Sequence, residues 1–226
     1  MAVPLPELLL IDKPAGITSM DVIRRLRRLT GVRKMGHAGT LDPLATGLML
    51  IGVEKGTKRL TELVKLDKEY LAEVRIGESR TTGDLEGDIV ETKEMTELEE
   101  QSIADTLSTM VGEIELPVSA YSAIKKDGVP MYKRARQAAK QGEMVDELPV
   151  RKMKVYEAEL LRYEIGDGRA VATVRFAVGS GTYIRSLAEE LGRRLGYPAT
   201  LQNLRRTKVG EFRIEDAKQI EDFKKE

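Results

Sequence analysis

Two strand-like segments joined by a short glycine-containing turn most constrain what this chain can fold into. Residues 152–165 and 169–178 have the pattern of strands and flank Gly166-Asp167-Gly168, a turn signal. The combination predicts a β-hairpin, so at least two neighbouring strands must run antiparallel. Further strand patterns, separated by helical ones, occur at 8–11, 48–53 and 68–77. We therefore predict an α+β fold with a mixed, largely antiparallel central sheet flanked by helices.

Four segments have the pattern of helices. The first follows Thr18, which forms a capping box with Asp21 and precedes an apolar face of Val22, Ile23, Leu26 and Leu29 that ends at Gly31. The others are 57–66, an acidic segment that starts at the caps Thr96 and Glu99 and ends near residue 111, and 182–196. Because no repeat, low-complexity tract or linker interrupts the chain, we expect residues 1–226 to form a single domain.

The composition excludes several kinds of site. The 226 residues include no cysteine and one histidine, which removes disulfides, thiolate ligands, cysteine nucleophiles and most zinc sites. No apolar run approaches the roughly 20 residues that span a bilayer. Residues 1–12 lack the basic segment of a signal peptide. We therefore expect a cytoplasmic protein that binds neither a membrane nor a metal.

Charged residues balance overall but are unevenly distributed. The chain has 37 basic and 37 acidic residues. Residues 1–60 hold ten basic and five acidic residues, 125–140 six and one, and 185–213 seven and three, whereas 84–115 holds eleven acidic residues and only Lys93. Binding of nucleic acid follows the local field, so these basic segments are compatible with an RNA partner, although solvated helix faces would give the same pattern.

A glycine-rich loop at 36–47, GHAGTLDPLATG, holds the best candidate for a reactive group. Pro43 restricts Asp42 to extended backbone, and the glycines let the chain turn tightly around it. A carboxylate fixed on a loop between two elements suits a covalent nucleophile. The alternative is an ordinary Asp-Pro turn. A phosphate-binding loop is disfavoured, because neither common glycine motif for phosphate occurs.

The same loop resembles the signature of the TruB-type tRNA pseudouridine-55 synthases. Further segments resemble blocks of that family, in the family's order: IDKPAGITSMDVIRRLRR (11–28), KEYLAEVRIGESRTTGDLEG (68–87), YSAIKKDGVPMYKRAR (121–136), LPVRKMKVYEAELL (148–161), GSGTYIRSLAEELG (179–192) and LRRTKVGEF (204–212). The resemblance spans residues 8–213 and implies the pseudouridine synthase fold.

The resemblance implies an isomerase that converts the T-loop uridine of tRNA, at position 55, to pseudouridine without a cofactor. In that family the target uridine is flipped out, its N-glycosidic bond breaks, the uracil turns, and C5 is joined to the ribose C1′. The resemblance makes Asp42 the catalytic carboxylate, Arg185 its paired cation, and Tyr70 the ring that stacks on the base and accepts the C5 proton. By pattern alone, Arg185 is a surface arginine and Tyr70 a core residue. Whether the carboxylate attacks C1′, attacks the base or assists loss of a ribose proton is left open.

Other residues receive supporting roles from the resemblance. His37, Tyr183 and Leu204 would contact the substrate, and Lys13 would support the catalytic loop structurally. A basic insertion at 121–152 would close over the RNA. Candidate contacts to the RNA backbone are Lys125, Arg134, Arg136, Arg151, Arg205 and Arg206. We expect a monomer that binds the T-stem-loop of tRNA.

Two departures from the family pattern bear on the site. The chain stops at Glu226, so we expect the C-terminal RNA-binding domain usual in bacterial members to be absent. A double proline usual before the YSAIK segment is replaced by Val118-Ser119, which leaves the geometry at the entry of the insertion uncertain.

Two other functions stay open. The first is binding and refolding of tRNA without catalysis. The second is glycoside hydrolysis by Asp42 together with Asp12 or Asp84. Three Phe, seven Tyr and no Trp offer little aromatic surface for sugars, which disfavours the second.

Overall fold

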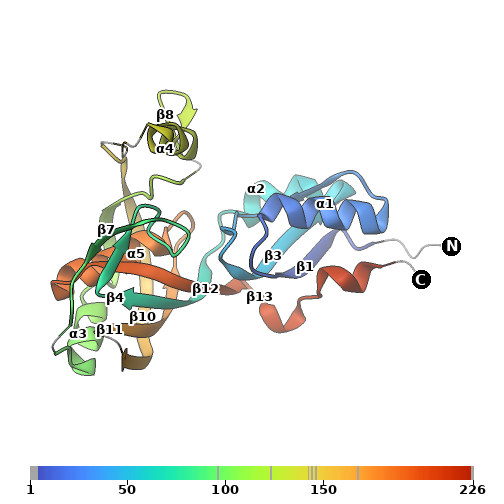
Figure 1. Ribbon diagram of the computed structural model, residues 1–226. Coiled ribbons are helices and arrows are strands. Elements are labelled where there is room, and N and C mark those ends of the chain that lie inside the picture. The colour runs from blue at the N-terminus through green and yellow to red at the C-terminus, as the bar shows by residue number, and fades with distance from the viewer. Residues whose placement is uncertain are drawn as a thin grey trace. The chain divides into compact units, whose positions relative to one another are not determined.

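The computed structural model describes residues 5–95, 97–122, 124–141, 143, 145, 147–166 and 168–224 (Figure 1). The predicted cap Thr96 and the turn residue Asp167 lie outside these ranges. The chain divides into two units, Met1–Leu71 with Leu204–Glu226 (unit 1) and Ala72–Asn203 (unit 2). Two strands, β4 (Lys68–Ile76) and β12 (Ala199–Val209), each begin in one unit and end in the other. That all of the chain forms one domain stays a prediction.

Unit 1 is built on a strand pair that carries the glycine-rich loop. β1 (Leu8–Lys13) runs antiparallel to β3 (Thr46–Val53), and β2 (Met35–His37) pairs antiparallel with β3. The last part of β12 runs parallel to β3, with Arg205 opposite Thr46, and β13 (Phe212–Arg213) pairs with β12. The pairing is therefore mixed but mainly antiparallel, as predicted.

The predicted first helix is α1 (Ser19–Thr30). Thr18 and Asp21 form the reciprocal capping box, and Gly31 ends the helix in the left-handed conformation, so both predicted signals are confirmed. Val22, Ile23 and Leu26 are fully buried. Each contributes roughly 1.5–3 kcal/mol by burial, which explains why α1 packs against β2 and the 3₁₀ helix η3 (Ile220–Phe223). A second 3₁₀ helix, η2 (Ile214–Asp216), precedes it.

The helix predicted at 57–66 was too long. The chain forms the 3₁₀ helix η1 (Glu54–Arg59) and a short helix α2 (Leu60–Leu63) instead. Within η1, the backbone at Gly56 packs against the preceding segment, because a Cβ atom there would meet the carbonyl oxygen of Glu7 at 1.8 Å. A 3₁₀ helix is more tightly wound than an α-helix and is common as a short connector of this kind.

Unit 2 contains the predicted hairpin. β10 (Val150–Gly166) and β11 (Arg169–Val178) pair antiparallel, which confirms the hairpin, and the strand order is β12-β4-β11-β10-β7 with β7 (Gly112–Pro117) at the edge. Alternate residues of β11, from Ala170 to Val178, are buried. Two helices of this unit, α3 (Glu100–Ser108) and α5 (Ile184–Leu195), are each shorter than the predicted segment.

Two small additions to unit 2 matter for the site. β5 (Glu78–Arg80) and β6 (Ile89–Thr92) form a separate two-stranded sheet whose connection is the loop 81–88. The segment 121–152, which we call the flap, contains β8 (Lys125–Lys126), β9 (Val129–Pro130) and α4 (Met131–Lys140) (Figure 1). Within the described ranges, no helix is long and apolar enough to cross a membrane.

Candidate active site

The loop that carries Asp42 connects β2 to β3 and is fixed by the segment that precedes α1. The amide of Gly16 donates to the carbonyl oxygen of Pro43 at 2.8 Å. Ser19 Oγ donates to the carbonyl oxygen of Leu41 and accepts from its amide, at 2.9 and 2.8 Å. Asp42 itself is half-buried, and its carbonyl oxygen accepts from the amide of Ala45 at 3.1 Å. The carboxylate therefore sits on a loop with its backbone already paired on both sides.

Lys13 lies under this loop and is fully buried. Its Nζ donates to the carbonyl oxygens of Pro14, Pro43 and Ala45 at 3.0, 3.2 and 2.6 Å. A buried ammonium has to satisfy its three donors within the protein, and here three carbonyls accept them. Lys13 thus joins the end of β1 to both sides of Asp42.

The role predicted for Arg206 is wrong. We predicted that it contacts RNA phosphates, but it is 1% exposed, and its Nε and Nη2 donate to the carbonyl oxygens of Leu48 and Gly39 at 2.7 and 3.3 Å. A guanidinium enclosed in this way has no surface to offer a phosphate. Its backbone is equally close-packed, because a Cβ atom on Gly47 would lie 2.3 Å from the Arg206 carbonyl oxygen.

Lys68 and Tyr70 occupy the same buried face of β4. Lys68 Nζ donates to the carbonyl oxygens of Val64 and Leu66, and its side chain passes beside Gly39. Burial, and next the Arg206 guanidinium, lower the pKa of Lys68 to about 8. Tyr70 is 7% exposed. The candidate stacking ring of Tyr70 therefore shares a face of β4 with Lys68, whose side chain lies next to Gly39 of the loop.

The other predicted residues of unit 1 lie on β2 and β12. His37 ends β2; burial and then the Arg206 guanidinium lower its pKa, and its Nδ1 has no hydrogen-bond partner among the described residues. Leu204 is 8% exposed. Arg205 forms a two-pronged ion pair with Asp12 at 2.8 and 3.2 Å, so Asp12 is engaged at the end of β1. This pairing disfavours Asp12 as a second glycosidase carboxylate.

In unit 2, Arg185 is buried and surrounded by oxygen atoms. Its Nη1 donates to Ser119 Oγ at 2.6 Å and to the carbonyl oxygen of Thr82 at 2.8 Å, and its Nη2 donates to the carbonyl oxygen of Tyr121 at 3.2 Å. Asp84 Oδ2 lies 3.8 Å from Nη1. By pattern alone Arg185 is a surface arginine, and that alternative is excluded.

Asp84 is a buried turn residue. Its Oδ1 accepts from Thr82 Oγ1 at 2.5 Å and from the amide of Glu86 at 3.2 Å. Asp42 belongs to unit 1 and Arg185 to unit 2, and their pairing stays a prediction.

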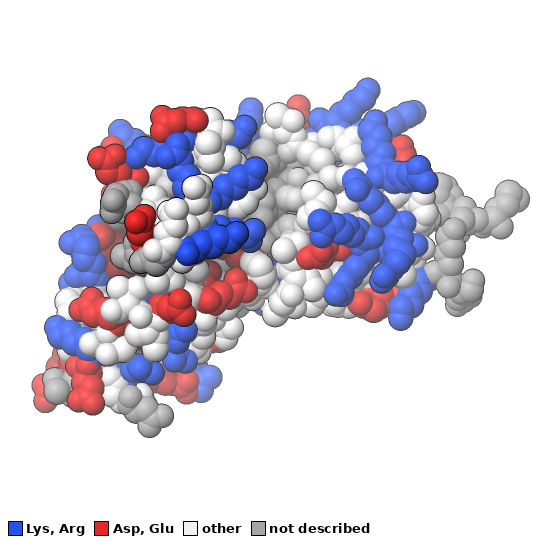
Figure 2. All heavy atoms as spheres, turned by 45° about the horizontal axis from the view of Figure 1, so that its top comes forward, with Lys and Arg blue, Asp and Glu red and all other residues white. Residues whose placement is uncertain are grey.

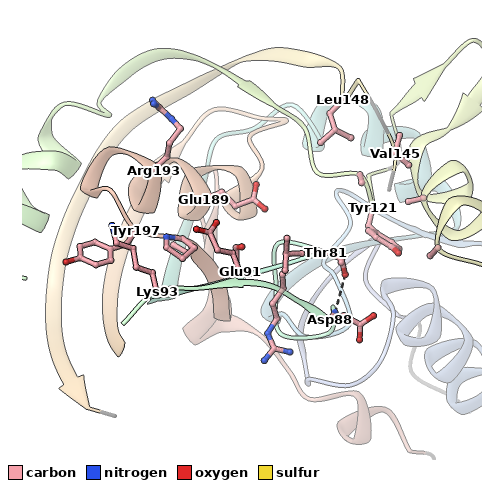
Figure 3. A pocket seen from close by; sticks show the side chains of 18 of the residues that line it. Thr81, Asp88, Glu91, Lys93, Tyr121, Val145, Leu148, Glu189, Arg193 and Tyr197 are labelled. Carbon is pink, nitrogen blue, oxygen red and sulfur yellow. Dashed lines mark hydrogen bonds between the residues drawn. The ribbon is translucent and has the colours of Figure 1, made fainter. Parts of the chain in front are cut away.

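A cavity of about 760 Å³ lies in unit 2 between the β5–β6 sheet, α5 and the flap. Figure 3 shows Glu189 pointing from α5 toward its middle, with Lys93 and Tyr197 on one side and Tyr121 and Leu148 on the other. Although Glu189 is an exposed residue, the surrounding protein desolvates its carboxyl and raises its pKa to about 7, against the effect of Arg185. Asp88 and Glu91 also line the cavity, together with Arg80, Lys93 and Arg193, so its charged side chains are of both signs.

The predicted RNA contacts of the flap differ in how free they are to bind. Lys125, Arg136 and Arg151 are exposed, whereas Arg134 Nη2 donates to the carbonyl oxygen of Lys126 and pairs with Asp127. Tyr183 is half-buried and precedes the first residue of α5. Unit 1 also carries a basic surface: Figure 2 shows Lys and Arg side chains gathered over it, and α1 alone contributes Arg24, Arg25, Arg27 and Arg28.

Three residues of the site escaped the sequence analysis. Glu189 lies one helical turn after Arg185, so helical spacing could have found it. Lys68 lies two residues before Tyr70 on the same strand face, which strand alternation could have found. Ser119 was noted only as a departure from a family pattern. Its contact with Arg185 spans 66 residues, and no local signal reveals it.

Two protein-family models match this chain. A family model described as "TruB family pseudouridylate synthase (N terminal domain)" matches residues 27–184, and one described as "tRNA pseudouridylate synthase B C-terminal domain" matches residues 185–226. The chain therefore belongs to the TruB family of pseudouridylate synthases, which are isomerases. The second match covers α5 and β12, which we had assigned to the catalytic domain.

Individual relatives agree with this family assignment. The tRNA pseudouridine synthase B of Corynebacterium efficiens is 44% identical over 216 residues, covering 96% of this chain and 71% of that protein. The tRNA pseudouridine synthase B of Leifsonia xyli is 46% identical over 216 residues, covering 94% of this chain and 70% of that protein.

Solved structures show the same fold. A chain from the crystal structure of a Cbf5-Nop10-Gar1 complex is 29% identical with a TM-score of 0.70, covering 95% of this chain and 52% of that one. A chain from the structure of an H/ACA RNP bound to a substrate RNA containing 2′-deoxyuridine is 27% identical with a TM-score of 0.66, covering 95% of this chain and 51% of that one. This chain thus spans about half the length of both.

Proposed function

We propose that this chain converts uridine 55 in the T-loop of tRNA to pseudouridine, acting as a monomer without metal or cofactor, with Asp42 as the catalytic carboxylate. Membership of the TruB family and relatives named for tRNA support the reaction and the substrate class. The observation that carries the choice of Asp42 is its loop, which Gly16, Ser19 and Lys13 hold from three directions. A fixed carboxylate loses little freedom when substrate binds.

The reaction is an isomerisation. The bond between N1 and C1′ breaks, the uracil turns, a bond forms between C5 and C1′, C5 loses its proton, and N1 gains one, so the mass of the RNA is unchanged. In a site closed by RNA, Asp42 needs a nearby cation to stay ionised, and we assign Arg185 to that role. Tyr70 is the proposed stacking ring and the acceptor of the C5 proton; stacking on a base contributes roughly 1–3 kcal/mol.

Three further residues are proposed to hold the flipped uridine and the opened loop. Burial lowers the pKa of His37, which favours its neutral form, and its buried Nδ1 has no hydrogen-bond partner among the described residues. Tyr183 and Leu204 would contact the nucleotide. Phosphates flanking the uridine would meet the exposed side chains of Lys125, Arg136 and Arg151, with Arg134 supporting the flap. Arg205 is half-buried and paired with Asp12, so it would have to share its guanidinium between that carboxylate and a phosphate.

Tritium release tests the proposal. A tRNA transcript labelled at uridine C5 is incubated with the wild-type chain and with Asp42→Asn, a variant of equal size that lacks the ionised carboxylate. Release of one equivalent per tRNA by wild type alone, mapped to the T-loop, is the expected result. Release by both proteins would remove Asp42 from the chemistry. No release by a folded wild type would reject this reaction on this substrate.

The same samples separate the two alternatives. Binding of tRNA with no tritium release by wild type would favour an RNA-refolding protein. Free uracil in the reaction mixture would favour a hydrolase. Against the hydrolase, Asp84, the remaining candidate for a second carboxylate, is enclosed by Thr82, Glu86 and Arg185.

A further inference from the structure

A buried carboxylate begins β5 and is surrounded by arginines. Glu78 is 0% exposed; its Oε1 accepts from Arg80 Nε at 2.5 Å, and its Oε2 lies 3.1 Å from Arg169 Nη2 and 4.0 Å from Arg75 Nη1. A buried carboxylate is stable only when cations and hydrogen bonds compensate it. Of the three arginines, Arg80 makes the closest contact, so Glu78 fixes the orientation of its guanidinium.

From that position Arg80 closes the loop that follows it. Its Nη1 donates to the carbonyl oxygens of Leu85 and Gly87 at 3.3 and 2.9 Å, while Nε stays on Glu78. The planar guanidinium serves all three acceptors at once, which an ammonium on a flexible stem cannot do. The two ends of the loop pack closely, because a Cβ atom on Gly87 would lie 2.5 Å from Thr82 Oγ1.

Two residues inside this closed loop, Thr82 and Asp84, lie against Arg185, and Ser119 and Tyr121 hold it from outside the loop. The carbonyl oxygen of Thr82 accepts from Arg185 Nη1 at 2.8 Å, and Asp84 Oδ2 lies 3.8 Å from the same atom. Thr82 Oγ1 donates to Asp84 Oδ1 at 2.5 Å, so these two partners of Arg185 are linked directly to each other. A continuous series of contacts therefore runs from Glu78 through Arg80 and the loop to Arg185.

We propose that Arg80, oriented by Glu78, is a positioning residue for Arg185 in pseudouridine formation. It touches neither substrate nor reacting atoms in this role; it sets the place of the Thr82 and Asp84 oxygens beside the Arg185 guanidinium. The inference rests on the proposed function for its effect on rate. A displacement of about 1 Å in a reacting group can reduce the rate about 100-fold, so loosening this loop should reduce catalysis without weakening RNA binding.

The matched control is Arg75, which contacts the same carboxylate but not the loop. Arg75 Nε donates to Gln202 Oε1 at 2.9 Å. Arg80→Ala should lower the single-turnover rate of tritium release about 10- to 100-fold with an unchanged Kd for tRNA. Arg75→Ala should leave both quantities unchanged. Arg80→Lys keeps the charge, and we expect it to rescue little of the rate.

A double-mutant cycle separates positioning from general damage to the fold. If Arg80 acts through Arg185, then Arg80→Ala should reduce the rate much less in an Arg185→Lys background than in wild type. Equal reductions in both backgrounds, or equal reductions by Arg75→Ala and Arg80→Ala, would overturn the proposal. If Arg80→Ala does not fold, the cycle is run with Arg80→Lys and Glu78→Gln under the same expectations.

A second readout does not depend on activity. In protein labelled with ¹⁵N at arginine side chains, the Nε–H and Nη–H protons of Arg185 should exchange slowly with water in wild type and Arg75→Ala, and faster in Arg80→Ala. Unchanged exchange in Arg80→Ala would overturn the positioning role. If wild type releases no tritium while the exchange result holds, the proposed function fails and the positioning of Arg185 by Arg80 stands.

Discussion

In unit 1 the Asp42 loop is held by cations that donate to its backbone, whereas in unit 2 the Arg185 guanidinium is held by oxygens that accept from it. Lys13 and Arg206 together donate to the carbonyl oxygens of Gly39, Pro43, Ala45 and Leu48, and both are at most 1% exposed. Around Arg185, the hydrogen-bond acceptors are the Ser119 hydroxyl and the carbonyls of Thr82 and Tyr121.

This difference predicts that damage in unit 1 lowers the stability of the fold, whereas damage around Arg185 changes the rate of the reaction. Removing either a buried cation or its carbonyl partners in unit 1 leaves polar groups that no water can reach. Because such unpaired groups are costly, damage there should lower the stability of the fold. The Arg185 contacts come from connecting segments at 82 and 119–121, and one weakened acceptor leaves the others in place. Changes there should move the guanidinium and alter the rate more than the stability.

The largest loss of stability is expected for Gly47→Ala. This glycine has φ +104°, and an added Cβ atom would lie 2.3 Å from the Arg206 carbonyl oxygen. Strain and overlap together should lower the free energy of unfolding by about 3–5 kcal/mol. Gly112→Ala is the matched control, since Gly112 has φ +116° and no atom within 4 Å, and about 1–2 kcal/mol is expected. Equal losses in urea denaturation would show that close packing of the loop contributes nothing.

Lys13→Met should be the next most damaging change. The substitution keeps the length of the side chain but leaves the carbonyl oxygens of Pro43 and Ala45 without their donor. We expect the free energy of unfolding to fall by about 2–4 kcal/mol, measured by urea denaturation. Lys55→Met, at an exposed position, should change little. A stable Lys13→Met protein that is merely slow would contradict the division drawn between the units.

Ser119→Ala should alter activity rather than folding. It removes the Oγ that lies 2.6 Å from Arg185 Nη1, while the carbonyls of Thr82 and Tyr121 still accept from the guanidinium. The single-turnover rate of pseudouridine formation should fall about tenfold, while the urea midpoint moves little. Ser108→Ala, at the end of α3, serves as control. A large drop in the urea midpoint with an unchanged rate would show that the contacts around Arg185 serve stability, as those in unit 1 do.

The smallest effect concerns pH. The pKa of Glu189 is about 7 in the folded protein, above its ordinary value of 4.5, so its contribution to stability is fully present below pH 4.5 and is lost as the pH rises through 7. Glu189→Gln should therefore flatten the change of the thermal midpoint between pH 5 and pH 8. Glu113→Gln, an exposed substitution, should leave the profile unchanged. A Glu189→Gln profile parallel to wild type would show that the cavity does not desolvate this carboxyl.

Local patterns predicted the elements well where one residue dictates the backbone. Thr18 and Gly31 bound α1, and the strands on either side of residues 166–168 form the hairpin. β12 was missed, because its polar residues give no strand pattern: Arg206 is buried there by carbonyls of segments more than 150 residues away. Tertiary contacts of this kind override local propensity.

The candidate site divides in the same way. Asp42 stands out locally, since proline and glycines surround it. Arg185 and Tyr70 were singled out only through the family resemblance, because an arginine on an amphipathic helix and a tyrosine in a strand have commoner structural roles. The surroundings of Arg185, from Ser119 to the Arg80 contacts, depend on which loops meet in space, and spacing along the chain carries no record of that.

The division of unit 1 into two stretches of chain also sets an order of assembly on the ribosome. Unit 2 is one continuous stretch, residues 72–203, and every group around Arg185 has been translated before Leu204 is added. The Asp42 loop is translated early. The hydrogen bond from Arg206 to the carbonyl oxygen of Gly39 in that loop can form only after Arg206 has been added. In the order of translation, the hydrogen-bond acceptors around Arg185 therefore precede Arg206, the last donor to the Asp42 loop.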